Sequence, residues 1–327
     1  MLADHATLQG ISLRSVINAW EEAKNARSVV SVIFIVIGHS KPSHHIDGVA
    51  RHRSKNKHRG KPSVLMDPLR IALLHLAPRS ADLAYNQRLV EEGIAVAAKA
   101  GAKWIVTPEL ATTGYTFAEI IGTDWIATQP DAWLQHICEI ARRLGVATFI
   151  GHVERDQERN TLHNSVFAIG ASGELLRQHR KINTLRIGSE AWSTPGVDPT
   201  VVELHPFGKV GVLVCADACS PGIATQLKAD GARLLVSSAS WAPGLHGPNG
   251  EWERITELTG LPLFVCNRTG DDKIMNFAKA ESVVAHHGRR LLSMTSTESA
   301  AFLIEWNMQA DNLHCQPVRL DIPVKCH

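Results

Sequence analysis

The 327-residue sequence lacks the short motifs that hold nucleotides or structural metals. Neither GxGxxG nor GxxxxGK(S/T) occurs, so no glycine-rich loop that cradles phosphate is indicated. The six cysteines include no CxxC pair, and the CxxxC spacing of Cys215 and Cys219 has no His-x-His beside it, so a zinc site is not supported. A chain this long does not need a disulfide scaffold. We therefore expect a reducing compartment and a cytoplasmic location.

A hydrophobic run long enough to cross a membrane is also missing. Residues 29–37 are apolar apart from Ser31, but a bilayer requires about 20 residues. A signal peptide would end in small residues of the Ala-x-Ala type, whereas His39, Lys41 and Pro42 follow this run. No internal repeat is evident. We expect no membrane partner.

Charge is unevenly distributed along the chain. Residues 1–65 hold ten Lys/Arg against four Asp/Glu (+6), which leaves −4 of the net +2 for residues 66–327. Residues 39–63 are too polar to bury a core, and we expect them to be disordered. This basic segment lacks the interleaved aromatics of single-strand binders, and its histidines are irregularly spaced, so neither nucleic acid nor a metal is predicted as a partner. We hypothesise that residues 1–65 are a disordered or spurious N-terminal extension and that 66–327 form the working domain.

From Met66 onward, apolar runs alternate with amphipathic segments. Strands are predicted at 69–76, 104–107, 146–153, 164–169, 210–214, 233–237 and 263–266, and helices at 82–99, 131–144, 221–229 and 251–258. Three strand-like runs, near 281–286, 290–292 and 300–306, follow. Interleaved β and α elements that end in strands predict layered α/β packing, not a helix bundle or an all-β sandwich.

Three reactive side chains follow predicted strands. Glu109 comes after the strand at 104–107, Lys181 follows a strand, and Cys215 ends the strand at 210–214. Strand ends of an open α/β sheet converge on a common crevice, so these side chains are expected to meet. A carboxylate, an amine and a thiol are the parts needed for acyl transfer, since the carboxylate takes the thiol proton and the cation stabilises developing charge.

Other interpretations of the thiol are open at this point. Cys215 could be a small core residue, as buried cysteines usually are. Cys219 is a rival nucleophile, although it lies inside the turn and not at the strand end.

The sequence resembles the nitrilase, or carbon–nitrogen hydrolase, superfamily over roughly residues 69–308. The three signature blocks appear in order as Pro108-Glu109-Leu110 with Gly114-Tyr115, then Arg180-Lys181, then Gly211-Val-Leu-Val-Cys215-Ala-Asp217. Supporting blocks are Asn164-Ser165, Glu190, Trp241, Asn267-Arg268-Thr269-Gly270, and Ser282-Val-Val with Gly288. The family's Arg-Ala-x-Glu-Asn stretch is here Ile255-Thr-Glu-Leu-Thr-Gly260.

The resemblance implies a four-layer α-β-β-α sandwich that assembles as a homodimer or larger homo-oligomer and needs no cofactor or metal. It also implies a set of roles, namely Glu109 as general base, Lys181 as oxyanion-stabilising cation, Cys215 as nucleophile, the Ala216 backbone N–H as second oxyanion donor, Glu190 as substrate-positioning carboxylate, and Tyr115 and Trp241 as pocket-lining residues. A solvated loop carboxylate is the alternative for Glu190, and simple packing is the alternative for the two aromatics.

The residues after the nucleophile bear on the substrate. Cys215-Ala216-Asp217 resembles the amidase and carbamoyl hydrolase pattern more than the Cys-Trp-Glu of true nitrilases. The resemblance therefore implies hydrolysis of a small linear amide or N-carbamoyl compound through a cysteine thioester. The alternatives are a nitrile hydrolase, an amide-dependent acyltransferase and a non-enzymatic binding module. Turnover of nitriles alone would identify the first, and acyl product formed with an added amine would identify the second.

Overall fold

The computed structural model describes residues 67–186, 188–272 and 274–323. The predictions for residues 1–65 lie outside the described residues. Within the described ranges, no helix combines the length and the apolar character that crossing a membrane would require.

Most of the strands belong to two β-sheets. The first sheet contains β1 (Leu69–His75), β2 (Trp104–Val106), β3 (Ala147–Arg155), β4 (Leu162–Ile169), β5 (Leu175–Arg180), β14 (Ala300–Asn307), β15 (Asn312–Leu313) and β16 (Val318–Asp321). The second contains β6 (Thr200–Leu204), β7 (Gly208–Val214), β8 (Leu234–Ala239), β9 (Leu263–Asn267), β12 (Ser282–His286) and β13 (Arg289–Met294). The short strands β10 (Asp271–Asp272) and β11 (Met275–Asn276) pair with each other.

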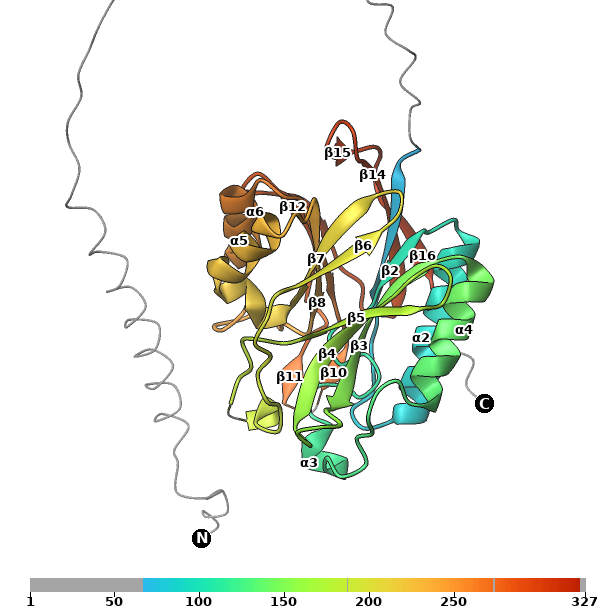
Figure 1. The fold of residues 1–327 in the computed structure, drawn as a ribbon, viewed down its shortest axis with the longest axis vertical. Helices are drawn as coiled ribbons and strands as arrows, with labels where there is room; N and C mark the ends of the chain where they lie inside the picture. Colours follow the sequence, from blue (N-terminus) through green and yellow to red (C-terminus); the bar gives the residue numbers. More distant parts are fainter. Residues whose placement is uncertain (1–66, 187, 273, 324–327) are drawn as a thin grey trace, which may run out of the picture. The chain divides into compact units, whose positions relative to one another are not determined.

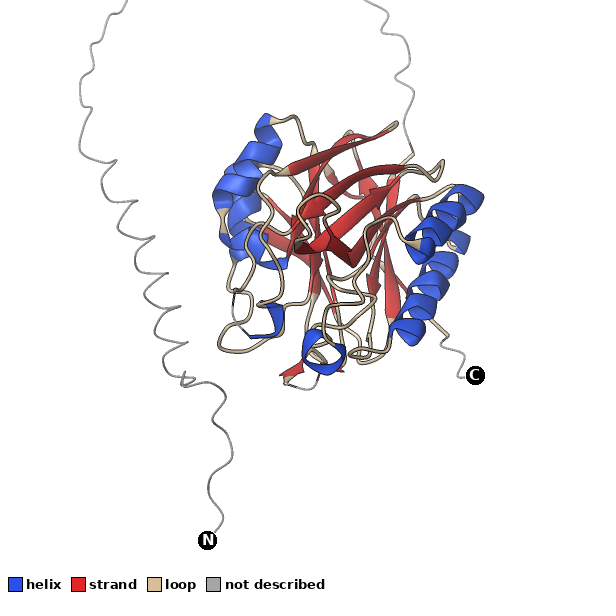
Figure 2. Cartoon of the chain, turned by 60° about the horizontal axis from the view of Figure 1, so that its bottom comes forward, coloured by secondary structure: helices blue, strands red, loops and turns tan. Residues whose placement is uncertain are grey.

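Four helices cover the outer faces of the two sheets, namely α2 (Leu83–Lys99), α4 (Ala132–Leu144), α5 (Pro221–Ala229) and α6 (Glu251–Thr259). The described residues also contain the short helix α3 (Ala118–Ile121) and two 3₁₀ helices, η1 (Gly188–Glu190) and η2 (Cys215–Cys219). Helices α2 and α4 lie on one side of the molecule and α5 and α6 on the other, with both sheets between them (Figures 1 and 2). The predicted four-layer α-β-β-α sandwich is therefore confirmed.

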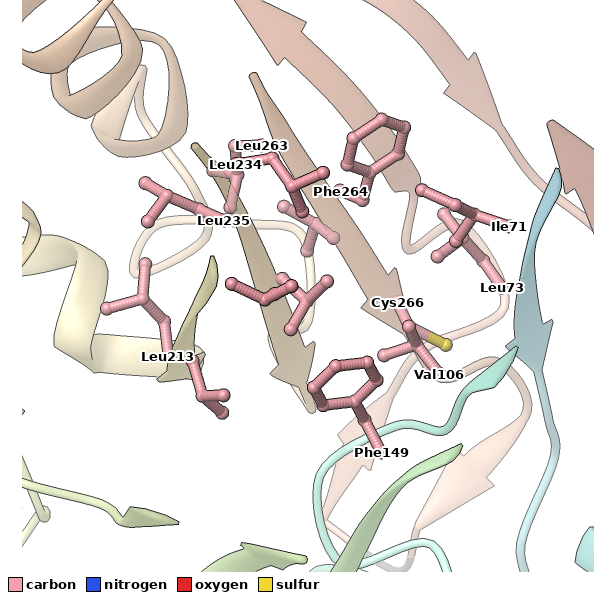
Figure 3. Close-up of a cluster of buried hydrophobic side chains, with 14 of the residues drawn as sticks. Ile71, Leu73, Val106, Phe149, Leu213, Leu234, Leu235, Leu263, Phe264 and Cys266 are labelled. Carbon is pink, nitrogen blue, oxygen red and sulfur yellow. The ribbon is translucent and has the colours of Figure 1, made fainter. Parts of the chain in front are cut away.

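Successive side chains of a strand point to opposite faces of its sheet, and the strands are apolar throughout because both faces are buried. In β1, Leu69, Ile71 and Leu73 pack into the core between the sheets, whereas Ala72 and Leu74 pack with α2 and α4. Figure 3 shows how side chains from both sheets fill the shared core. This double burial holds the two sheets at a fixed separation.

The predicted helix starts are confirmed by their capping bonds. The carboxylate of Asp82 accepts a hydrogen bond from the Tyr85 amide, and that of Asp131 accepts one from the Leu134 amide. Five strands were not predicted, namely β6, β10, β11, β15 and β16, and each has five residues or fewer. The longest of them, β6, pairs antiparallel with β7, and this pairing supplies the hydrogen bonds that stabilise so short a strand.

The topology brings several strand ends to one edge. Strands β1, β2 and β3 run parallel, and β5 has the same direction because it is separated from β3 by the antiparallel β4. Strands β7, β8 and β9 are likewise parallel in the second sheet. The segments that follow β2, β5, β7 and β8 carry the side chains described next.

Candidate active site

A buried ammonium group lies between two buried carboxylates. Lys181 Nζ is 2.7 Å from Glu109 Oε1, and it is 2.7 and 2.9 Å from Oε1 and Oε2 of Glu190. All three side chains are fully shielded from solvent. The solvated-carboxylate alternative for Glu190 is therefore wrong, and we refer to Lys181, Glu109 and Glu190 as the lysine cluster.

Neutral donors complete the lysine cluster. The Asn164 side-chain amide, from β4, donates to Glu109 Oε1 at 2.8 Å and to Glu190 Oε1 at 2.9 Å. The backbone amide of Ser240, just past β8, donates to Glu109 Oε2 at 2.9 Å, and its hydroxyl donates to the Glu109 carbonyl oxygen at 2.8 Å. Both sheets thus fix the orientation of Glu109.

A close backbone approach sets the position of the segment that carries Glu109. The amide of Gly151, in β3, donates to the Thr107 hydroxyl at 2.8 Å, and its carbonyl oxygen accepts from Ala111 at 3.1 Å. A Cβ atom at position 151 would collide with the carbonyl oxygen of Pro108. Glycine is required at this position because the two backbones touch.

Burial and charge act against each other in the lysine cluster. Burial raises the pKa of Glu109, and Lys181 reduces this effect without cancelling it. Burial by itself lowers the pKa of Lys181, but Glu109 and Glu190 outweigh it, so that pKa lies well above the usual value. Lys181 is therefore a permanent cation, whereas Glu109 is a carboxylate that accepts a proton more readily than an exposed one.

Cys215 begins η2 directly after β7, in a conformation that is unusual for its residue type. Its φ of 45° lies in the left-handed region, and its side chain is buried. Burial raises the pKa of the Cys215 thiol well above its usual value, and the charge of Glu109 adds to this, while Lys181 and the Ser240 backbone oppose it. The thiol is thus protonated at neutral pH, and the charges of the lysine cluster act on it.

Asp217 ties the segment that carries Cys215 to the segment that carries Lys181. Its Oδ1 accepts from the backbone amides of Ile182 and Asn183 at 3.0 and 2.8 Å. Its Oδ2 accepts from the Val214 amide at 2.9 Å and lies 3.0 Å from Nε2 of buried His179. Burial by itself raises the pKa of Asp217, but His179 and the backbone donors outweigh it, so the net shift is downward. Asp217, which the sequence indicated only as an amidase-like residue, is thus a structural link.

The other predicted site residues lie around this centre. Tyr115 OH is 3.4 Å from Glu190 Oε2. Trp241 follows Ser240, is partly buried, and its backbone amide donates to Asn267 Oδ1 at 3.0 Å. Ala216 occupies the first turn after Cys215, where backbone N–H groups have no partner within the helix. Cys219 is exposed at the far end of η2.

The sequence did not assign a role to Asn164, Ser240 or His179. Asn164 had been noted only as part of a supporting block, and Ser240 and His179 carried no signal because their partners are distant in sequence. Ser240 contributes its backbone amide to the site, and any residue type other than proline has such an amide. The identity of the residue therefore gives no sign of this contribution.

The chain is similar to known proteins in its sequence and in its fold. The family model described as "Carbon-nitrogen hydrolase" matches residues 70–275. A probable nitrilase of Schizosaccharomyces pombe is 24% identical over 260 residues, covering 76% of this chain and 91% of that protein. An omega-amidase of Danio rerio is 29% identical over 273 residues, covering 78% and 92%.

Solved structures show the same fold. An amidase mutant from Nesterenkonia sp. AN1 in complex with butyramide superposes with a TM-score of 0.64 at 24% identity, covering 75% of this chain and 94% of that one. Another mutant of that amidase shows covalent addition of the acetamide moiety of fluoroacetamide at its active-site cysteine; its TM-score is 0.64, and the match covers 74% and 92%.

We predict that Asp217→Asn lowers the free energy of unfolding by roughly 3–5 kcal/mol, because it replaces a buried carboxylate whose two oxygens both have hydrogen-bond partners. Urea unfolding near neutral pH measures this change. The folded-state pKa of Asp217 is depressed, so its contribution is present above the unfolded-state pKa and is lost as the pH falls through the folded-state value. The difference between the two proteins should therefore shrink in acid.

Asp230→Asn is the matched control, since Asp230 is exposed at the end of α5 and its carboxylate accepts from Gln226. We expect a change within about 0.5 kcal/mol. Equal stability of the two variants near neutral pH would contradict the linking role of Asp217.

Proposed function

The chain belongs to the carbon–nitrogen hydrolase family, and we propose that it hydrolyses the C–N bond of a small linear amide or N-carbamoyl compound through a thioester on Cys215. The observation that supports this most strongly is the lysine cluster beside a buried thiol. In this proposal, Glu109 is the base, Lys181 the cation and Cys215 the nucleophile, so that one buried centre contains all the parts of cysteine-based acyl transfer.

The first step is the formation of the thioester. The Cys215 thiol is protonated at rest, so attack requires a base, and Glu109 takes the proton as Sγ bonds to the amide carbon. The carbonyl π electrons move to oxygen, where the Lys181 ammonium and the Ala216 N–H stabilise the negative charge. Glu109 then gives its proton to the nitrogen. The C–N bond breaks, and ammonia or an amine leaves.

The second step regenerates the enzyme. A water molecule gives a proton to Glu109, and its oxygen attacks the thioester carbon. The C–S bond breaks, the proton returns to Sγ, and the carboxylic or carbamic acid product leaves. Glu190 and Asn164 hold Lys181 and Glu109 in place throughout both steps.

Two observations favour amides as the substrate class, namely the Cys215-Ala216-Asp217 sequence and the similarity to an omega-amidase. The similarity to a probable nitrilase keeps a nitrile as a second candidate, since the same thiol would attack the nitrile carbon. Assembly as a homo-oligomer and a cytoplasmic location stay predictions.

We expect Cys215→Ala to abolish ammonia release from a panel of small amides, N-carbamoyl amino acids and nitriles, while circular dichroism shows a folded protein. Cys219→Ala is the matched control, because this exposed thiol ends the same 3₁₀ helix. It should retain wild-type turnover. Activity in Cys215→Ala would refute the proposed nucleophile, and turnover of nitriles alone would replace the amide assignment.

Glu109→Gln should slow thioester formation by roughly 10²–10⁴-fold. The base form of Glu109 is lost as the pH falls through its raised pKa, so the wild-type rate should fall in acid with a midpoint above that of an ordinary glutamate. Single-turnover kinetics across pH would show this acid limb in the wild type but not in Glu109→Gln.

Glu154→Gln is the control for losing a buried carboxylate, because Glu154 is ion-paired with Arg180 and lies outside the lysine cluster. This variant should keep the acid limb. If Glu109→Gln also kept it, Glu109 would not be the base.

A further inference from the structure

Two histidines and an aspartate meet at the end of the sandwich opposite the lysine cluster. His286 ends β12, His287 follows it, and Asp311 lies in the turn between β14 and β15. Strand β12 is antiparallel to β9, and β14 is antiparallel to β1, so these strands finish where the parallel strands begin. Figure 1 shows β12 and β15 in the upper part of the molecule and α3, β10 and β11 at the bottom.

The three side chains offer ligand atoms at close range. One ligand atom from each of His286, His287 and Asp311 lies within 4.8 Å of the others. His286 Nε2 is 3.3 Å from Asp311 Oδ2, and the two imidazole rings lie with centroids 3.7 Å apart. His286 is buried against Trp306 of the facing sheet, with ring centroids 5.4 Å apart, whereas His287 and Asp311 are exposed.

A metal ion fits the spacing of these atoms. If buried His286 stays in place, an ion about 2.1 Å from its ligand atom lies at most about 3.2 Å from the other two ligand atoms, so each of these needs to move inward by roughly 1.1 Å at most to reach the same usual ligand distance. Changes of side-chain rotamer at His287 and Asp311 supply such movements, because both residues are exposed.

The backbone supports this arrangement at two of the three positions. His287 has a φ of 48° and Asp311 a φ of 52°, both in the left-handed region. Asparagine, aspartate and histidine tolerate this conformation better than most residues, but it still carries strain. Two turns from different sheets thus use left-handed backbone to bring their side chains together.

We propose that His286, His287 and Asp311 bind a divalent transition-metal ion of the zinc class. Two imidazoles and one carboxylate suit Zn²⁺, Co²⁺ or Ni²⁺, whereas Ca²⁺ and Mg²⁺ prefer oxygen ligands alone. The remaining coordination positions face solvent and take water. The ion joins the turn after β12, in the second sheet, to the β14–β15 turn, in the first sheet. It therefore stabilises the fold and takes no part in the proposed hydrolysis.

Zn²⁺ titration of the full-length, metal-free protein tests this site. Residues 1–65 hold six further histidines, and thiols also bind zinc, so the total stoichiometry alone does not suffice. The informative quantities are the loss of one bound equivalent in variants of the site and the rise in Tm caused by Zn²⁺. When the free Zn²⁺ concentration is a hundred times Kd, the wild-type Tm should rise by roughly 4 °C or more.

The variants His287→Asn and Asp311→Asn suit the test because asparagine accepts the left-handed backbone, so each should fold. Each should lose one Zn²⁺ equivalent in calorimetry, together with the Zn²⁺-dependent rise in Tm. His205→Asn is the control, since His205 is exposed in the loop between β6 and β7 and should keep both. If both site variants kept the wild-type stoichiometry and the wild-type rise in Tm, the proposal would be wrong.

Discussion

The charge of Lys181 is the constraint on which the rest of the site depends. An ammonium group that is shielded from water is costly unless it is paired, and here two carboxylates pair with it. The second carboxylate has a mechanistic consequence. When Glu109 takes a proton, Lys181 loses one counter-charge, but both oxygens of Glu190 stay within 2.9 Å of Nζ. In the proposed mechanism the cation therefore persists at the moment when the oxyanion forms.

At this edge of the sandwich, the site is built from groups that both sheets position. Asn164 lies in the first sheet, and Glu109 and Lys181 follow strands of that sheet. Cys215 and Ser240 follow strands of the second sheet. Two sets of hydrogen bonds cross between them, one from Ser240 to Glu109 and one from Asp217 to the backbone after Lys181. The apolar core between the sheets fixes their separation, so the packing in Figure 3 also sets the geometry of the site.

Sequence patterns predicted those features of the structure that depend on residues close together in the chain. Apolar runs located most strands, Asp82 and Asp131 marked helix starts, and the positions of Glu109, Lys181 and Cys215 at strand ends indicated that they would meet. Contacts between distant residues were beyond such reasoning. The backbone amide of Ser240, for example, donates to Glu109, which lies 131 positions earlier in the chain. Likewise, the adjacent pair His286-His287 gives no hint of Asp311, which only the return of the chain to the first sheet brings near.

The proposed mechanism requires a covalent bond between the substrate carbon and Cys215. Acid quenching of the wild-type protein during amide turnover, followed by tandem mass spectrometry, tests this directly. Cys215 and Cys219 share the tryptic peptide that spans residues 210–228, so fragment ions must locate the modification. We predict a mass increase equal to the acyl part of the substrate on Cys215 alone. An acyl group on Cys219, or turnover without any acylated cysteine, would contradict it.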